Sequence, residues 1–189
     1  MMRIAAIESA APAGSHGEPA TVRVWDPFVR VFHWTVVAGC MADLFVLGGG
    51  RTSHNVVGYT VAGLVVARVV WGFVGTRHAR FADFVPGPSG LLRYLEALAR
   101  GREPRFLGHN PAAAAMILAL LGTLAGLGLT GWMTTLDAFW GAEWLEELHE
   151  ALANGLIALV AIHAAAAVIE SVRHRENLVW AMVSGRKRP

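Results

Sequence analysis

The stretch ELHEALANGLIALVAIHAAAAVIE, residues 147–170, is an almost continuous apolar segment that contains two histidines, His149 and His163. In an α-helix a separation of fourteen residues places the second side chain within roughly 40° of the first and about 21 Å further along the axis. The two imidazoles therefore share one face of the predicted helix. They lie too far apart to bind the same ion.

The composition of the chain is that of a membrane protein. Of its 189 residues 54% are hydrophobic and 16% are charged, whereas about 25% of a soluble domain is charged. Crossing a hydrocarbon core of roughly 30 Å takes about 20 helical residues, and four apolar segments reach that length: residues 28–47, 54–74, 111–133 and 148–172. The sequence predicts an all-α, integral membrane four-helix bundle at residues 22–189, preceded by a polar, mobile cytoplasmic arm at residues 1–21.

Two further patterns concern the packing of these segments. Between the second and third segments, one side of a predicted short helix carries only apolar residues: Leu91, Leu92, Leu95, Leu98 and Ala99. This amphipathic pattern is typical of a helix that lies in the membrane interface. In the third segment Gly122 and Gly126 are four residues apart, which predicts close packing with a neighbouring helix.

The basic residues are distributed unevenly between the loops. The loop after the second segment and the C-terminal tail are rich in them: Arg77, Arg80, Arg93, Arg100, Arg102 and Arg105, then Arg173, Arg175, Arg186, Lys187 and Arg188. Residues 134–147 contain no lysine or arginine and four acidic residues. The positive-inside rule therefore predicts cytoplasmic termini in a bacterial inner membrane. It also accounts for the basic patches without a nucleic-acid partner.

Tryptophans and the remaining polar segments suit this topology. Tryptophan is enriched at membrane–water interfaces, and we expect two such groups: Trp132, Trp140 and Trp144, then Trp25, Trp71 and Trp180. His16, His78 and His174 lie in polar segments, which predicts solvated loop residues.

Four other histidines match in depth. His33 lies about one turn inside the first segment from its cytoplasmic end, and His54 opens the second segment after a short periplasmic loop. If the fourth segment descends from the periplasm, His163 is level with His33 and His149 is level with His54. We call His33 and His163 the inner pair, and His54 and His149 the outer pair. A lone histidine at such a depth favours a packing role, but two matched pairs favour metal ligation.

Two facing imidazoles at each of two levels suit haem. Haem iron takes its axial ligands from the protein, and the porphyrin supplies the other four nitrogens, whereas zinc requires three or four protein ligands that converge on one point. Cys40 is the only cysteine, which excludes covalent attachment through a CxxCH motif. The sequence predicts two non-covalent, bis-histidine b haems, with one ligand of each on the fourth helix.

Three polar residues near these levels have open roles. Arg68 lies fourteen residues after His54, hence on the same helix face, where it either neutralises a propionate of the inner haem or extends its charge to the interface. His109 precedes an Asn-Pro helix start and is a candidate for contact with a quinone or with the surroundings of the inner haem. Asp43 is charged within the first segment, and contact with Arg51, with water or with a proton path remains open.

Five stretches resemble one known family, the prokaryotic di-haem cytochrome b561 family, which includes the b-type membrane subunits of nickel-iron hydrogenases. They are VWDPFVRVFHW, RVVWGFVGTRHARFADF, GHNP, LHE and RHRENLVWAMVSGRK, in that order along residues 22–187. The resemblance implies a four-helix bundle with two b haems, whose ligands are His33 with His163 and His54 with His149. It also implies electron transfer between a periplasmic partner, such as a cytochrome, a dehydrogenase or a hydrogenase, and membrane quinone.

These observations predict a membrane electron carrier. The alternative is a haem-free transporter or a structural membrane anchor, in which the intramembrane charges and histidines form a proton relay. The chain has no catalytic triad or phosphate-binding loop, so any enzymatic activity would be quinone chemistry beside a haem.

Overall fold

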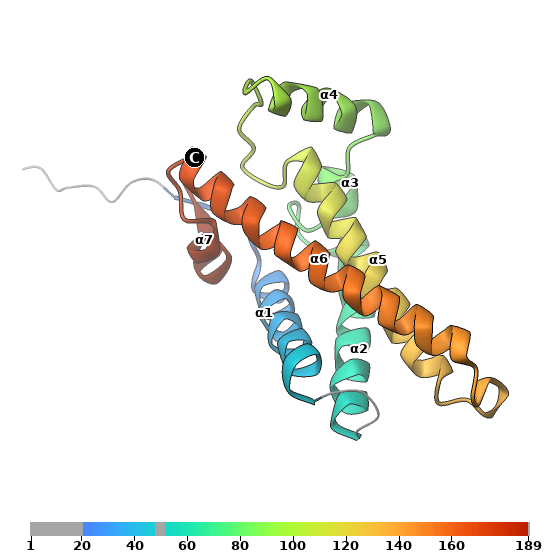
Figure 1. The fold of residues 1–189 in the computed structure, drawn as a ribbon. Coiled ribbons are helices and arrows are strands. Elements are labelled where there is room, and N and C mark those ends of the chain that lie inside the picture. Colours follow the sequence, from blue (N-terminus) through green and yellow to red (C-terminus); the bar gives the residue numbers. More distant parts are fainter. Residues whose placement is uncertain (1–20, 48–51, 189) are drawn as a thin grey trace, which may run out of the picture.

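Four long helices form the body of the protein in this computed structural model, which describes residues 21–47 and 52–188. Helix α1 (Pro27–Ala42) continues into a π-helical turn, η1 (Asp43–Leu47), and is followed by α2 (Thr52–Val74), α5 (Pro111–Met133) and α6 (Glu143–Arg173) (Figure 1). Each is long and apolar enough to cross a membrane. The predicted all-α membrane bundle is therefore confirmed. Most of the predicted N-terminal arm, His16 and Arg51 lie outside the described residues.

Shorter elements lie at the two ends of the bundle: β1 (Val22–Arg23), α3 (Phe81–Phe84), α4 (Pro88–Ala99), η2 (Asp137–Phe139), α7 (Leu178–Ser184) and β2 (Arg186–Lys187). We call the end with β1, α7 and β2 the terminal end, and the end with η1 and η2 the loop end. Helix α4 is the amphipathic helix predicted between the second and third long helices. Its Tyr94 is buried against Phe106, whereas Leu92 and Leu95 stay exposed, as expected for a helix that faces lipid.

Helix α5 is the central packing element, since it lies against both α2 and α6 (Figure 1). A Cβ atom added at Gly128 would approach the Cβ of Ala62 to 2.9 Å, and one added at Gly126 would approach Leu152 to 3.1 Å. A Cβ atom at Gly122 would meet nothing within 4 Å. The predicted close approach thus occurs at Gly126, and Gly128 takes the place expected for Gly122.

Helix α6 begins five residues before the apolar segment at 148. Its first turn contains Glu143 and Glu146, and acidic side chains stabilise a helix N-terminus because they face the positive end of the helix dipole. Hydropathy alone did not show this polar turn. The consequence is that His149 lies well inside a regular helix rather than at its frayed end.

Asp26 joins α1 to α2 at the terminal end. Its Oδ1 accepts a hydrogen bond from the backbone N–H of Val29 at 2.9 Å and so caps α1, while its Oδ2 accepts from Trp71 Nε1 at 3.1 Å and from the Thr76 hydroxyl at 2.6 Å. Burial alone would raise the pKa of Asp26, but these hydrogen bonds outweigh burial and hold the pKa below its usual value. An ionised Asp26 therefore fixes the entry of α1 beside the exit of α2.

The C-terminal segment folds back onto the bundle instead of forming a free tail. Strand β2 pairs antiparallel with β1, so that Lys187 lies opposite Val22. Trp25, predicted to lie in an interfacial group, is only 9% exposed and packs on His109, because the returning segment covers it. The other end differs, since Trp132, Trp140 and Trp144 are exposed.

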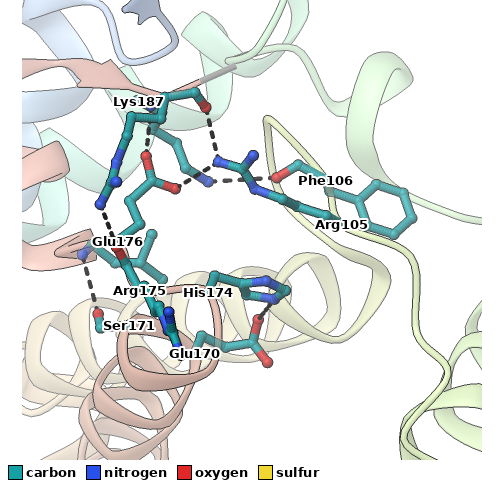
Figure 2. A network of polar contacts seen from close by, with 10 residues as sticks. Arg105, Phe106, Glu170, Ser171, His174, Arg175, Glu176 and Lys187 are labelled. Atoms are coloured by element: carbon teal, nitrogen blue, oxygen red, sulfur yellow. Dashed lines mark hydrogen bonds and ion pairs between the residues drawn. The ribbon is translucent and has the colours of Figure 1, made fainter. Parts of the chain in front are cut away.

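Glu176 is the centre of the polar network at the terminal end (Figure 2). Its buried carboxylate accepts hydrogen bonds from the backbone N–H of Arg188 at 2.7 Å and from the Arg105 guanidinium at 3.1 Å. Burial alone would raise the pKa of Glu176, but these bonds and the charge of Lys187 outweigh burial, and its pKa lies below its usual value. In the same network His174 pairs with Glu170 at 3.1 Å, so it is not the freely solvated residue that the sequence predicted.

A pH-dependent loss of stability follows from the lowered pKa of Glu176. A carboxyl group with a lowered folded-state pKa stabilises the fold above its unfolded pKa, and this stabilisation is lost as the pH falls through the folded value. We expect Glu176→Gln to reduce the free energy of unfolding in detergent at pH 7 by about 1–3 kcal/mol. The difference from wild type should shrink below about pH 4.5. Glu96→Gln, which breaks an exposed pair with Arg100, is the control; an equal effect of both variants would contradict the assignment.

Candidate functional site

The structure brings the four histidines together in the two pairs expected from their depth. In the inner pair, His33 on α1 and His163 on α6 have ring centroids 6.4 Å apart. In the outer pair, His54 on α2 and His149 on α6 have ring centroids 6.3 Å apart. Helix α6 therefore contributes one imidazole to each pair, as its fourteen-residue spacing predicted.

The distance between the rings suits an iron atom between them. Metal–imidazole bonds are about 2.0–2.1 Å long, and a ring nitrogen lies roughly 1 Å from the ring centre, so two rings on opposite sides of one metal have centroids about 6 Å apart. Among residues 21–47 and 52–188, no group of three or more His, Cys, Asp or Glu side chains converges as a metal site would require. Two protein ligands at each level thus fit a haem better than a zinc ion.

Space for a flat group is present beside the outer pair. Both α1 and α2 make few close backbone contacts with α6, and a cavity opens between the helices with about 720 Å³ of space free of atoms, including its open mouth. It is lined by all four long helices, for example by Cys40, Gly58, Leu124 and Ala153. A Cβ atom on Gly58 would meet nothing within 4 Å. The mostly apolar walls suit a porphyrin plane.

A hydrogen bond on one side and a carboxylate contact on the other lie behind the outer pair. The Thr130 hydroxyl lies 2.8 Å from Nδ1 of His149, and Oδ1 of Asp43 lies 3.4 Å from Nδ1 of His54. Gly131 lies against the ring of His149, since a Cβ atom added there would come within 3.3 Å of Cε1. Both Nδ1 atoms thus face polar groups of the protein, which leaves the Nε2 atoms for a ligand.

The inner pair has a different environment. Nδ1 of His33 is buried and has no hydrogen-bond partner among the described residues, and the His33 ring packs edge-on against Trp34. Arg68 on α2 is 3% exposed; its guanidinium donates to the carbonyl of Ala79 at 3.2 Å and lies over the Phe81 ring. Its Nη1 atom lacks a hydrogen-bond partner in the described part of the chain. A buried guanidinium with a spare donor is suited to an anionic group such as a propionate.

His109 lies close to the inner pair but faces a separate cavity. Its ring packs between Trp25 and Phe84, with centroid distances of 4.5 and 4.8 Å. Burial first, and then the positive charges of Arg68 and Lys187, lower the pKa of His109 to about 3, so the ring is neutral at physiological pH. The cavity beside it is also lined by Arg77, Asp83 and Gly108, among others.

His78 shares this second cavity with His109 and is half-buried. His78 is thus a loop residue, as predicted, but only part of its side chain is exposed. The reason is that His78 lies against Gly108 in the segment before α5, and no local sequence pattern shows that contact.

Sequence reasoning missed Asp43 and Thr130 as neighbours of the outer pair. Asp43 had no assigned partner, and Arg51, one of its candidate partners, lies outside the described residues. Their depth is the signal that could have found them, since Asp43 ends the first long helix and Thr130 nearly ends the third. Both therefore lie at the loop end, level with His54 and His149.

Comparison with known proteins places this architecture in a family. The model of the family described as prokaryotic cytochrome b561 matches residues 24–185. A probable Ni/Fe-hydrogenase B-type cytochrome subunit of Bradyrhizobium diazoefficiens is 27% identical, over 95% of this chain and 92% of the relative. Proteins of the same description from Rhodobacter capsulatus (27% identical, 88% and 81%) and Rhizobium leguminosarum bv. viciae (25% identical, 93% and 94%) are also similar.

The match of the family model covers all four long helices and both histidine pairs. A b-type cytochrome carries haem, which accounts for facing imidazoles between apolar helices better than a haem-free relay does. The chain belongs to the prokaryotic cytochrome b561 family, and it is a multi-pass membrane protein of haem-based electron transfer.

Proposed function

We propose that the protein relays electrons through two b haems between a periplasmic redox partner and the membrane quinone pool. The observation that supports this most is the pair of facing imidazoles at each of two levels on one shared helix, α6. A haem iron, when bound, exchanges one electron between its ferric and ferrous states. Two such sites stacked along α6 divide the thickness of the membrane into shorter steps.

In this proposal the residues of the chain hold the two groups and exclude water. His33 and His163 are the axial ligands at the inner level, and His54 and His149 are those at the outer level. Arg68 contributes a buried positive charge beside the inner level, where its unpaired Nη1 would bind a haem propionate. The apolar walls of the outer cavity keep the surroundings dry, which strengthens every nearby electrostatic interaction.

The names of the relatives support a redox enzyme as the partner, which we place on the periplasmic side. Their description as hydrogenase cytochrome subunits indicates a hydrogenase, or a dehydrogenase or cytochrome in its place, as the electron donor or acceptor. We assign quinone to the opposite, terminal end, where the neutral His109 ring lines a cavity near the inner pair. A quinone edge in that cavity would lie within reach of the inner level.

Haem stoichiometry tests the proposal directly. Purified protein should contain two haems per chain by pyridine haemochrome assay, and its oxidised form should show two low-spin signals by paramagnetic resonance, because each iron has two imidazole ligands. About one haem per chain in folded protein would contradict the pairing. Protein without haem would instead favour the transporter or anchor.

The orientation in the membrane is a second part of the proposal. The arginine-rich C-terminal tail and the loop with α4 should face the cytoplasm in an inner membrane, together with the N-terminus. A phosphatase fused to the C-terminus, which is active only in the periplasm, should remain inactive, and the same reporter inserted after Asp137 should be active. The reverse pattern would place the inner pair on the periplasmic side and exchange the two partner surfaces.

A further inference from the structure

We propose that Asp43 and Thr130 are positioning residues for the outer pair, and that the Asp43 carboxylate makes the outer haem harder to reduce than the inner one. This inference rests on the proposed function, because it concerns the axial ligands His54 and His149. Asp43 is not one of the four histidine ligands, and packing does not explain a carboxylate in a membrane-spanning segment. The inference assigns a role to this carboxylate.

The hydrogen bonds of Thr130 determine which nitrogen of His149 carries the proton. A hydroxyl group has one proton to donate. The carbonyl of Gly126 lies 2.9 Å from the Thr130 oxygen and accepts that proton in the way typical of a helical threonine. The hydroxyl oxygen is then an acceptor toward Nδ1 of His149 at 2.8 Å. His149 therefore carries its proton on Nδ1, and its Nε2 lone pair is free to bind iron.

Asp43 does the same for His54 with a charged group. Its Oδ1 and Nδ1 of His54 are both buried, neither makes a hydrogen bond to a described residue, and each is the other's close polar neighbour. They lie 3.4 Å apart, a little longer than a usual hydrogen bond. A carboxylate can only accept a hydrogen bond there, so it favours the tautomer of His54 that carries its proton on Nδ1. The π-helical turn η1 begins at Asp43 and places it beside the start of α2.

A carboxylate behind a ligating imidazole also changes the electronics of the metal. It raises the basicity of the ligand and places negative charge near the iron, and both effects favour the ferric state over the ferrous state. A hydroxyl behind His149 has no such charge. Asp43 should therefore lower the reduction potential of the outer haem through His54. Its effect on the inner haem should be weaker, because the inner haem is further away.

The inner pair has the opposite electrostatic setting. Nδ1 of His33 has no such acceptor in the described chain, and the buried charge on the same face of α2, further toward the terminal end, is the cation Arg68. A nearby positive charge favours the ferrous state. With haem held at both levels, these two charges would make electron transfer from the outer to the inner level favourable, toward the end to which we assign quinone.

The test is a redox titration of the purified, haem-loaded protein, followed by absorption and by the two low-spin resonance signals. The signal that is absent from His54→Ala identifies the outer haem. We expect Asp43→Asn to increase the equilibrium constant for reduction of the outer haem by about tenfold, which is about 59 mV for one electron. The inner haem should keep its wild-type potential. Thr130→Val should change the resonance signal of the outer haem and leave that of the inner haem unchanged.

Two substitutions are matched controls. Asp137→Asn removes one carboxylate from the exposed loop at the same end of the bundle, and Thr123→Val removes a hydroxyl that bonds only within α5, to Ala119. Neither should change the potential or the signal of either haem. An outer potential in Asp43→Asn equal to that of wild type, or an equal shift of both haems, would overturn the proposal.

A loss of the outer haem in Asp43→Asn would be resolved by Asp43→Glu. If the glutamate variant keeps the outer haem at its wild-type potential, the carboxylate is the required group, as proposed. If both variants lose it, the site needs the size of Asp43 and not its charge, and the proposal is wrong. The proposed function fails separately, because in that case the wild-type protein itself would hold fewer than two haems.

Discussion

His163→Ala should remove one haem, or convert it to a high-spin form, and leave the other haem unchanged. The substitution deletes one of the two imidazoles at the inner level, so that His33, 6.4 Å away between ring centroids, would face a void in an apolar setting. The outer pair loses no ligand, because His149 lies about four helical turns away on α6. Haem content should fall from two per chain to about one.

The other three histidines complete the test. His33→Ala should give the same phenotype as His163→Ala, while His54→Ala and His149→Ala should form a second class that lacks the other haem. Absorption and paramagnetic resonance spectra of the four purified variants distinguish the classes. If His163→Ala grouped with His54→Ala, or if His33→Ala kept both low-spin signals, the ligand pairing would be wrong, and His109 would be the first residue to examine.

Electron transfer across a vesicle membrane should fall to background in all four variants. The two levels are separated by about 21 Å along α6, so that removal of either site leaves a single gap of that length or more. Vesicles that contain a quinol on one side and a soluble cytochrome on the other measure this directly. A variant that lacks one haem and still conducts at the wild-type rate would show that the two sites do not act in series.

Gly131→Val should abolish the outer site without unfolding α5. A Cβ atom at this position would lie 3.3 Å from Cε1 of His149, and the two methyl groups of valine would press the ring away from His54. Glycine is the weaker helix former, so the substitution does not weaken the helix itself. We expect haem content to fall from two per chain to about one, with the inner low-spin signal intact.

Gly122→Val is the matched control on the same helix. A Cβ atom at Gly122 would meet nothing within 4 Å, and the position is exposed. This variant should keep both haems. If Gly131→Val kept both haems, the interpretation of Gly131 would be contradicted. If Gly122→Val lost the same haem, the loss would result from valine in α5 in general and not from contact with the ring of His149.

The sequence by itself determined the number of long helices, their order and the level of each histidine. These properties follow from one-dimensional quantities: the length of an apolar run against the thickness of a bilayer, and the regular rise of a helix per residue. Helix α5 was predicted with the bounds it has, because Asn110 and Pro111 are a strong start signal and cap it through the Ala113 N–H. The fourteen-residue spacing of His149 and His163 likewise placed them on one face of α6.

Only the tertiary structure decided which side chains lie behind the outer pair and how the end of the chain folds. Asp43, Thr130 and Gly131 reach His54 and His149 through the packing of four helices. The rotation of one helix about its axis against another is not encoded in the hydropathy of either. From the sequence we expected Trp25 at the membrane interface and Lys187 in a free tail. Both are buried, because β2 pairs with β1 from 163 residues away. Such long-range contacts depend on the free energy of the whole packed bundle, and no local pattern specifies them.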